Sequence, residues 1–96
     1  MKYLTLIAAL LFAPPAFAEE EDGCKVLGDL AHLVMERRQE RVPMSDMMAI
    51  AGDNDFIRQV VIEAYDRPAM NVAENQREMA SNFRNDIEAI CYGAQK

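Results

Sequence analysis

The chain has 96 residues, of which 51% are hydrophobic and only 7% aromatic, and its 16 acidic residues outnumber 10 Lys and Arg, giving a net charge of −6. This length excludes two ordinary domains. The acidic balance excludes a nucleic-acid binder, whose affinity depends on basic side chains that contact phosphate. The apolar content is too high for a disordered tail. We therefore expect one small folded domain.

The first 18 residues have the pattern of a bacterial export signal. Lys2 supplies the positive start, residues 3–12 are almost all apolar, and a small-x-small cleavage site ends at Ala18. The apolar stretch is about half of the roughly 20 residues that a membrane span needs. Cys24 does not directly follow the cleavage site, so a lipid anchor is not expected either. Cleavage after Ala18 leaves residues 19–96 as a single helical domain in the periplasm or the medium, with a net charge of −7 because Lys2 is lost.

Cys24 and Cys91 are the only cysteines of the chain and lie near the two ends of the expected domain. In an oxidising compartment, an even pair of this kind predicts a disulfide bond. The two are not spaced as a CxxC redox motif. Because the bond closes a long loop, we expect it to stabilise the domain by roughly 4 kcal/mol.

The spacing of apolar residues predicts a first helix from Asp22 to Arg41. Acidic residues precede it and arginines end it, which suits the helix dipole. Pro43 should stop it, because the residue before a proline is disfavoured in helical geometry. The expected buried stripe contains Cys24, Leu27, Ala31, Val34 and Met35, and a second apolar flank contains Val26, Leu30 and Leu33.

Two shorter helices are expected in the middle of the chain. Ser45 is the expected N-cap of a helix over residues 46–51. Either Asp53 or Asn54 is expected to cap a third helix, which extends to about Asp66. The expected buried stripe of that helix contains Phe56, Ile57, Val60, Val61 and Ala64.

A fourth helix is expected from the capping-box-like sequence at Asn71–Glu74 to about Tyr92, with Gly93 as its stop. Its expected apolar face contains Val72, Gln76, Met79, Ala80, Phe83, Ile87, Ile90 and Cys91. The sequence thus predicts an all-α bundle of about four helices, two long and two short, closed by one disulfide. The two long helices should pack antiparallel or crossing where the cysteines meet.

The sequence contains no pattern that predicts catalysis or metal binding. His32 is the only histidine, and Glu36 and Glu40 lie on a polar helix face with nothing apolar to raise a pKa. Asp53 begins a calcium-loop-like run, but the twelfth position of that loop would be Ala64 instead of Glu. Nucleophile, phosphate-loop and zinc motifs are missing from the sequence. We expect no enzyme, no cofactor and no metal site.

The best candidate for an interaction surface is a segment rich in Arg and Met, here called the Arg/Met segment. It contains Arg37, Arg38, Arg41, Met44, Met47 and Met48. Arg binds carboxylates in two-pronged geometry, and Met adapts to varied surfaces. The alternatives are an internal ion pair at a helix end for the arginines and core packing for the methionines. Arg38 lies four residues from Val34, on the expected buried stripe.

Three stretches of the sequence carry a resemblance to known proteins. They are Ala31–Ser45 with its Met-Glu-Arg-Arg-Gln, Val61–Pro68, and the late Phe83 with Cys91-Tyr92. Together they resemble small, exported, one-disulfide helical proteins of bacteria and their phages. The resemblance implies the fold and brings no activity and no site. Acid-stress chaperones and immunity proteins of the periplasm share the size and helical build by analogy alone.

The expected function is that of a non-enzymatic binding protein whose partner is another protein in the periplasm or the medium. The alternative is an acid- or stress-responsive periplasmic chaperone, because 16 carboxylates that lose their charge could open the fold and expose Met-rich surface. A metal buffer is the weakest of the three hypotheses. A homodimer is a further alternative, because the second apolar flank, Val26, Leu30 and Leu33, could pack against a second copy.

Overall fold

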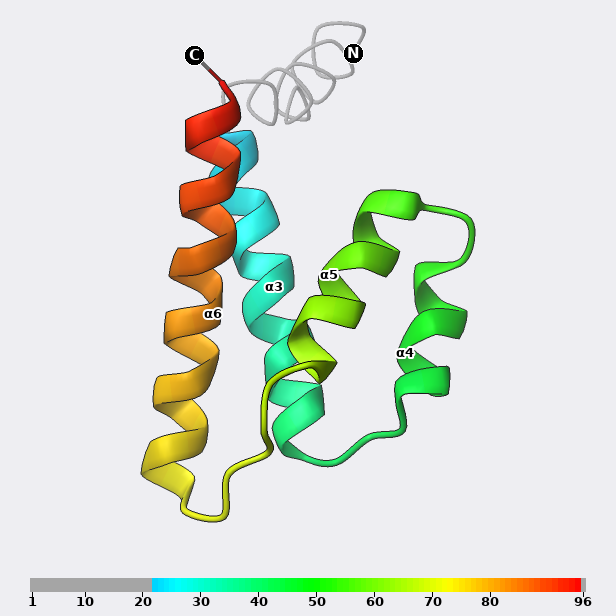
Figure 1. Ribbon diagram of the computed structural model, residues 1–96, viewed down its shortest axis with the longest axis vertical. Coiled ribbons are helices and arrows are strands. Elements are labelled where there is room, and N and C mark those ends of the chain that lie inside the picture. The colour runs from blue at the N-terminus through cyan, green and yellow to red at the C-terminus, as the bar shows by residue number, and fades with distance from the viewer. Residues whose placement is uncertain (1–21, 96) are drawn as a thin grey trace, which may run out of the picture.

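The computed structural model describes residues 22–95, so the expected export signal lies outside the described residues. This part of the chain is all-helical and contains no strand (Figure 1). Its four helices are α3 (Gly23–Gln39), α4 (Met44–Ala51), α5 (Asp55–Tyr65) and α6 (Ala73–Ala94). The prediction of an all-α bundle with two long and two short helices is therefore confirmed.

The two long helices, α3 and α6, lie antiparallel and are joined at one end by the predicted disulfide (Figure 1). The Cα atoms of Cys24 and Cys91 are 5.5 Å apart, which is ordinary disulfide geometry. Gly28 of α3 makes room for the side chain of Glu88 on α6, with which a Cβ atom at this position would collide. Beside this contact, Arg84 of α6 forms ion pairs with Asp29 of α3 and with Glu88.

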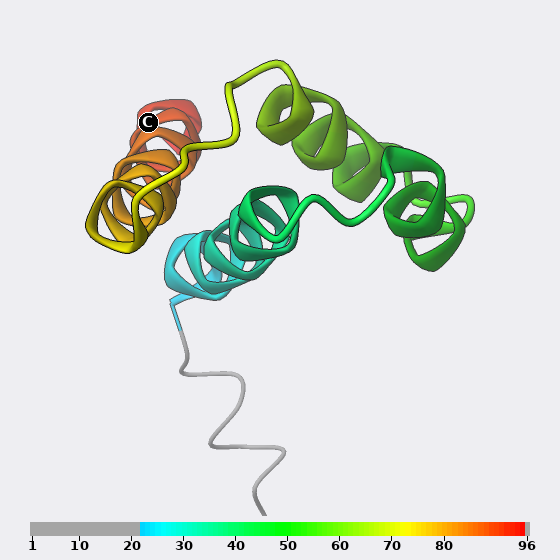
Figure 2. The same ribbon diagram turned by 90° about the horizontal axis from the view of Figure 1, so that it is seen from below.

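The hydrophobic core is formed by all four helices, with α3 in the middle. Viewed from below, α3 lies between α6 on one side and α5 on the other, and α4 packs on the outer side of α5 (Figure 2). The buried core residues are Ala31, Val34, Met35, Met47, Val60, Val61, Ala64, Ala80, Phe83 and Ile87. Most of them belong to the apolar stripes that the sequence predicts.

The first helix ends at Gln39, so the prediction that it extends to Arg41 is wrong. Arg41 has a φ of 66°, in the left-handed region. The backbone N–H of Arg41 donates to the carbonyl oxygen of Arg38, and that of Val42 donates to Arg37. These two bonds form a Schellman motif, which usually has Gly where this chain has Arg41. The helix is thus ended by this turn before Pro43 is reached.

Three expected helix boundaries are also corrected. Ser45 does not cap α4, because the helix already begins at Met44 with Pro43 at the cap position. Asn71 does not cap α6, since its side-chain oxygen accepts a hydrogen bond from Arg41 Nη2 instead, at 2.8 Å. Gly93 does not stop α6, which continues to Ala94.

Of the two residues expected to cap the third helix, the structure selects Asn54, and it adds a cap at Asp22 that was not predicted. Asn54 caps α5, and its side-chain oxygen accepts from the backbone N–H of Ile57 at 3.0 Å. Asp22 caps α3 by accepting from the backbone N–H of Cys24. Each side chain thus satisfies one of the backbone donors that a helix start leaves without a partner.

Several residues predicted to be buried are exposed. Phe56 on α5 is 58% exposed and Ile90 on α6 is 68% exposed. Val26 and Leu33 of the second flank on α3, which were not predicted to be buried, are each 46% exposed, and Val72 of the expected apolar face of the last helix is 55% exposed. The reason is that α5 and α6 both pack on α3 without packing closely on each other, so the apolar flanks that face away from α3 have no covering helix.

The connection between α5 and α6 is held by Gln39, whose side chain is only 4% exposed. Its Nε2 donates to the carbonyl oxygen of Pro68 at 3.0 Å, and its Oε1 accepts from the backbone N–H of Met70 at 2.6 Å. These bonds tie the end of α3 to a loop some thirty residues later. The sequence analysis did not identify this role for Gln39.

We expect Gln39→Leu to lower the free energy of unfolding by about 1–3 kcal/mol, because it removes two part-buried hydrogen bonds and leaves the carbonyl of Pro68 and the N–H of Met70 without this partner. Urea denaturation followed by circular dichroism measures the change. Gln59→Leu is the control, since Gln59 is exposed and should change stability by less than about 0.5 kcal/mol. Equal stability of the two variants would contradict the role of Gln39.

Candidate functional site: an apolar groove at the disulfide end

The three arginines of the Arg/Met segment all bind groups of their own chain. Arg38 Nε donates to the carbonyl oxygen of Arg67 at 2.9 Å, and its guanidinium lies over the ring of Tyr65. Arg37 forms an ion pair with Glu40 at 2.9 Å. Arg41 donates a hydrogen bond to the side chain of Asn71. The contacts of Arg38 and Arg41 therefore tie the end of α3 to the α5–α6 connection. Arg38 is therefore bound within the chain, as the alternative of an internal contact predicted. Its partner is a carbonyl oxygen, however, and not the acidic side chain that an ion pair requires.

The methionines of the segment are separated by the fold. Met47 is buried in the core, Met48 is half-buried against it, and Met44 is exposed. Only Met44 and the outer arginine Arg41 present substantial surface to solvent. The use of the Arg/Met segment as a binding surface stays a prediction, and it rests on fewer accessible groups than the sequence suggested.

A larger apolar feature lies at the opposite end of the bundle, beside the disulfide. It is a groove of about 400 Å³, open to solvent, between residues 56–63 of α5 and residues 87–95 at the end of α6, with α3 contributing one residue. Its lining residues are Leu27, Phe56, Gln59, Val60, Glu63, Ile87, Ile90, Cys91, Ala94 and Gln95. We call this feature the apolar groove.

The walls of the apolar groove combine buried and exposed apolar side chains. Val60 and Ile87 are core residues that form its deep part, whereas Phe56 and Ile90 stand at its edges with most of their surface in solvent. Among residues 22–95, Glu63 is the only charged residue that lines the groove. The groove is therefore shaped to contact apolar side chains, and its lining offers neither a nucleophile nor an acid–base pair.

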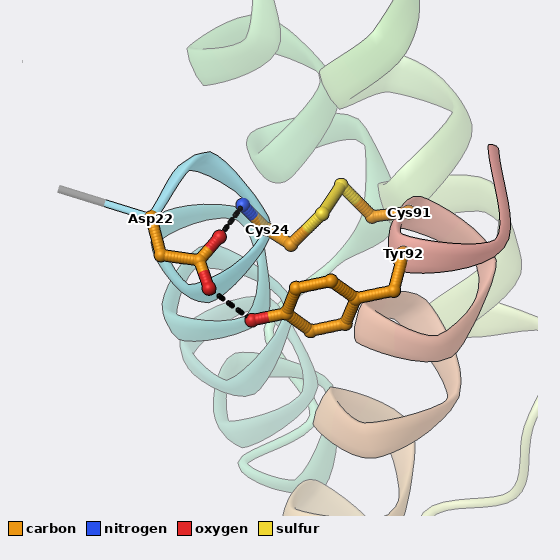
Figure 3. The surroundings of a disulfide bond; sticks show 4 residues. All are labelled: Asp22, Cys24, Cys91 and Tyr92. Carbon is orange, nitrogen blue, oxygen red and sulfur yellow. Dashed lines mark hydrogen bonds between the residues drawn. A yellow bond between two sulfur atoms is a disulfide. The ribbon is translucent and has the colours of Figure 1, made fainter. Parts of the chain in front are cut away.

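Next to the groove, Asp22 links the two long helices (Figure 3). One carboxylate oxygen accepts from the backbone N–H of Cys24 at 2.9 Å, and the other accepts from the hydroxyl of Tyr92. The hydrogen bond from Tyr92 lowers the pKa of Asp22, and the same bond raises the pKa of Tyr92. These contacts and the disulfide fix the end of α6, which carries the groove residues Ile90 and Ala94.

We expect the melting temperature to fall as the pH drops below about 4, the ordinary range of an Asp carboxyl. The folded pKa of Asp22 is lowered, so its contribution to stability is present above the unfolded pKa and is lost as the pH falls through the folded pKa. Tyr92→Phe should reduce the part of this fall that depends on Asp22. Thermal unfolding of both proteins from pH 7 to pH 2 tests this, and identical acid profiles would contradict the link.

Residues 22–95 contain no group of three or more His, Cys, Asp or Glu side chains that could hold a metal ion. His32 is half-buried, and its Nδ1 lies 3.7 Å from the carboxylate of Glu36, one turn along the same helix. Of the two carboxylates Glu36 and Glu40, which are one turn apart, Glu40 binds Arg37. In the described part of the chain, Glu36 and Glu40 both lie within ion-pair distance of Arg37.

A second and smaller apolar hollow, of about 170 Å³, lies between α3, α4 and α5. Its most exposed lining residue is Ile50, at 77%, and Leu33 of the expected second flank also lines it. It is less than half the size of the apolar groove. Neither feature was predicted from the sequence. Phe56 and Ile90, which line the apolar groove, were expected to lie in the core.

Comparison of the chain with protein-family models, curated proteins and solved structures found no match. No helix within residues 22–95 is long and apolar enough to cross a membrane. The apolar groove and the export signal that the sequence predicts are therefore the features that indicate a function.

Proposed function

We propose that this chain is an exported, non-enzymatic binding protein that contacts another protein in the periplasm or the medium through the apolar groove. The observation that carries the proposal is the combination of an open apolar hollow with two large exposed side chains, Phe56 and Ile90, at its edges. Contiguous exposed apolar surface of this kind is typical of protein interaction sites.

The rigidity of the groove supports this function. Cys91 lies in its wall and is bonded to the fully buried Cys24 of α3. The Tyr92–Asp22 hydrogen bond holds the same turn of α6. A surface that is ordered before binding loses less conformational entropy when a partner docks. The disulfide also agrees with the oxidising compartment to which the predicted signal would send the chain.

The test is capture of partners from periplasmic extract by the tagged protein in its exported form. We expect a captured protein to be lost with Phe56→Ser and with Ile90→Ser. Ile50→Ser is the matched control, because Ile50 is an equally exposed isoleucine that lines the other hollow. Capture that is unchanged by both groove variants, or no captured protein at all, would contradict the proposal. Loss of capture with Met44→Ser alone would instead assign binding to the Arg/Met segment.

An acid-responsive chaperone is the second candidate. It is favoured by the position of Asp22, whose carboxylate caps α3 and binds Tyr92 directly beside the groove. Protonation of that carboxylate would loosen the groove end and expose more apolar surface. Suppression of client aggregation near pH 3, lost with Ile90→Ser, would support it. A protein that stays compact at that pH and suppresses no aggregation would exclude it.

A further inference from the structure

The residues that line the apolar groove indicate what kind of partner it can bind. We propose that the apolar groove receives an amphipathic helix of another protein, which places an apolar face in the groove and a basic side chain beside Glu63. This inference rests on the proposed function and specifies the partner of the same site.

The shape of the groove matches a helix. On α5, the lining residues Phe56, Val60 and Glu63 follow one another at intervals of four and three. On α6, Ile87 and Cys91 lie four residues apart, as do Ile90 and Ala94, and the two pairs are offset by three residues. Both walls thus present ridges of helically spaced side chains over about two turns, roughly 11 Å. The side chains of a third helix interlock with ridges of this kind.

The position of the groove in the bundle also favours a helix. α5 and α6 pack on α3 but not closely on each other (Figure 2), and the residues that line the groove come from all three of these helices. A docked helix would lie in the groove and complete a four-helix arrangement. Phe56 and Ile90, which are exposed in the free protein, would then become core residues.

The charge of the groove selects a basic partner. Glu63 lines the groove and forms an ion pair with no cation of residues 22–95. Arg67, four residues further along the chain, forms its ion pair with Asp86. The last turn of α6 also lacks a basic residue, so the negative end of its helix dipole faces this region uncompensated by a described side chain.

The same charges argue against a second copy of this chain as the occupant. Two copies that meet through the groove would bring two Glu63 carboxylates and two acidic chains together, each with a net charge of −6 before any cleavage. Like charges at an interface oppose association, whereas a basic partner gains attraction and faster encounter. The groove therefore suits a different, positively charged protein segment.

The test uses two labelled helical peptides with the same leucine face, one flanked by Lys and the other by Glu, added to the exported protein. Fluorescence anisotropy measures their affinities. We expect the Lys peptide to bind at least about tenfold more tightly than the Glu peptide. Ile90→Ser should weaken the Lys peptide by about tenfold, and Glu63→Lys should reverse the preference in favour of the Glu peptide. Glu78→Lys is the matched control, because Glu78 is an exposed acid of α6 outside the groove lining.

Equal affinities for the two peptides would overturn the inference, as would an equal effect of Glu63→Lys and Glu78→Lys, which would reduce the binding to overall charge. A dimer in ultracentrifugation that Ile90→Ser abolishes would assign the groove to a second copy and also overturn it. If the peptides fail while partner capture still depends on Phe56, the inference is wrong and the proposed function stands. If the peptides behave as expected but no partner is captured, the proposed function is wrong.

Discussion

Replacing both cysteines with alanine will lower the free energy of unfolding by roughly 4 kcal/mol while most of the helix content is kept. Cys24 and Cys91 are separated by 67 residues, so their bond removes many conformations from the unfolded chain. A core of this size supplies only about 3–5 kcal/mol unaided. The doubly substituted protein should therefore be close to the limit of stability at ordinary temperatures.

Urea denaturation of the oxidised, reduced and doubly substituted proteins measures this effect. Reduction should destabilise the natural protein to about the level of Cys24→Ala/Cys91→Ala, and the same reductant should leave the substituted protein unchanged. Two reactive thiols in the native protein, or an unchanged midpoint after reduction, would contradict the structural role of the bond.

Phe83→Ala is expected to lower the free energy of unfolding by about 3–5 kcal/mol. Phe83 is completely buried and is among the largest fully buried side chains of the described structure. Its ring also lies under the guanidinium of Arg67, 4.7 Å from the ring centre, and this contact would be lost with it. The cavity left by the ring would lie between α6 and the residues of α3 and α5 that form the core.

Phe56→Ala is the matched control for this substitution. The two phenylalanines lie on helices whose periodicity predicts both to be buried, yet Phe56 is mostly exposed at the edge of the groove. We expect Phe56→Ala to cost less than about 1 kcal/mol and to weaken partner capture instead. A stability loss for Phe56→Ala as large as that for Phe83→Ala would show that the groove is closed in solution.

Helical periodicity and the two cysteines were sufficient to predict the architecture. The apolar spacing located all four helices, and the single cysteine pair predicted which helix ends meet. The helix ends were less predictable. A Schellman turn usually has Gly at its left-handed position, and in this chain that position is occupied by Arg41. Asn71 has the character of an N-cap but binds Arg41 in the folded chain, an interaction between segments thirty residues apart.

The groove could not be predicted, because it depends on how far α5 and α6 lie from each other. Phe56 and Ile90 extend real apolar stripes, and a sequence alone does not reveal that the stripes are wider than the surface α3 can cover. Likewise, Arg38 and Gln39 are polar residues whose partners are backbone groups of a distant loop. The sequence identified Arg38 as unusual from its place on the buried stripe and gave no signal for Gln39.

The most direct measurement of the proposed binding role is site-specific photo-crosslinking in a bacterial host that expresses the full chain. A photoreactive amino acid is placed at position 90 in one variant and at position 50 in another. Both positions are highly exposed isoleucines, but only Ile90 lines the apolar groove. If the groove binds another protein, position 90 should give a crosslinked complex with a second protein and position 50 should not. Crosslinks at position 50 alone, or at neither position, would contradict the assignment of function to the groove.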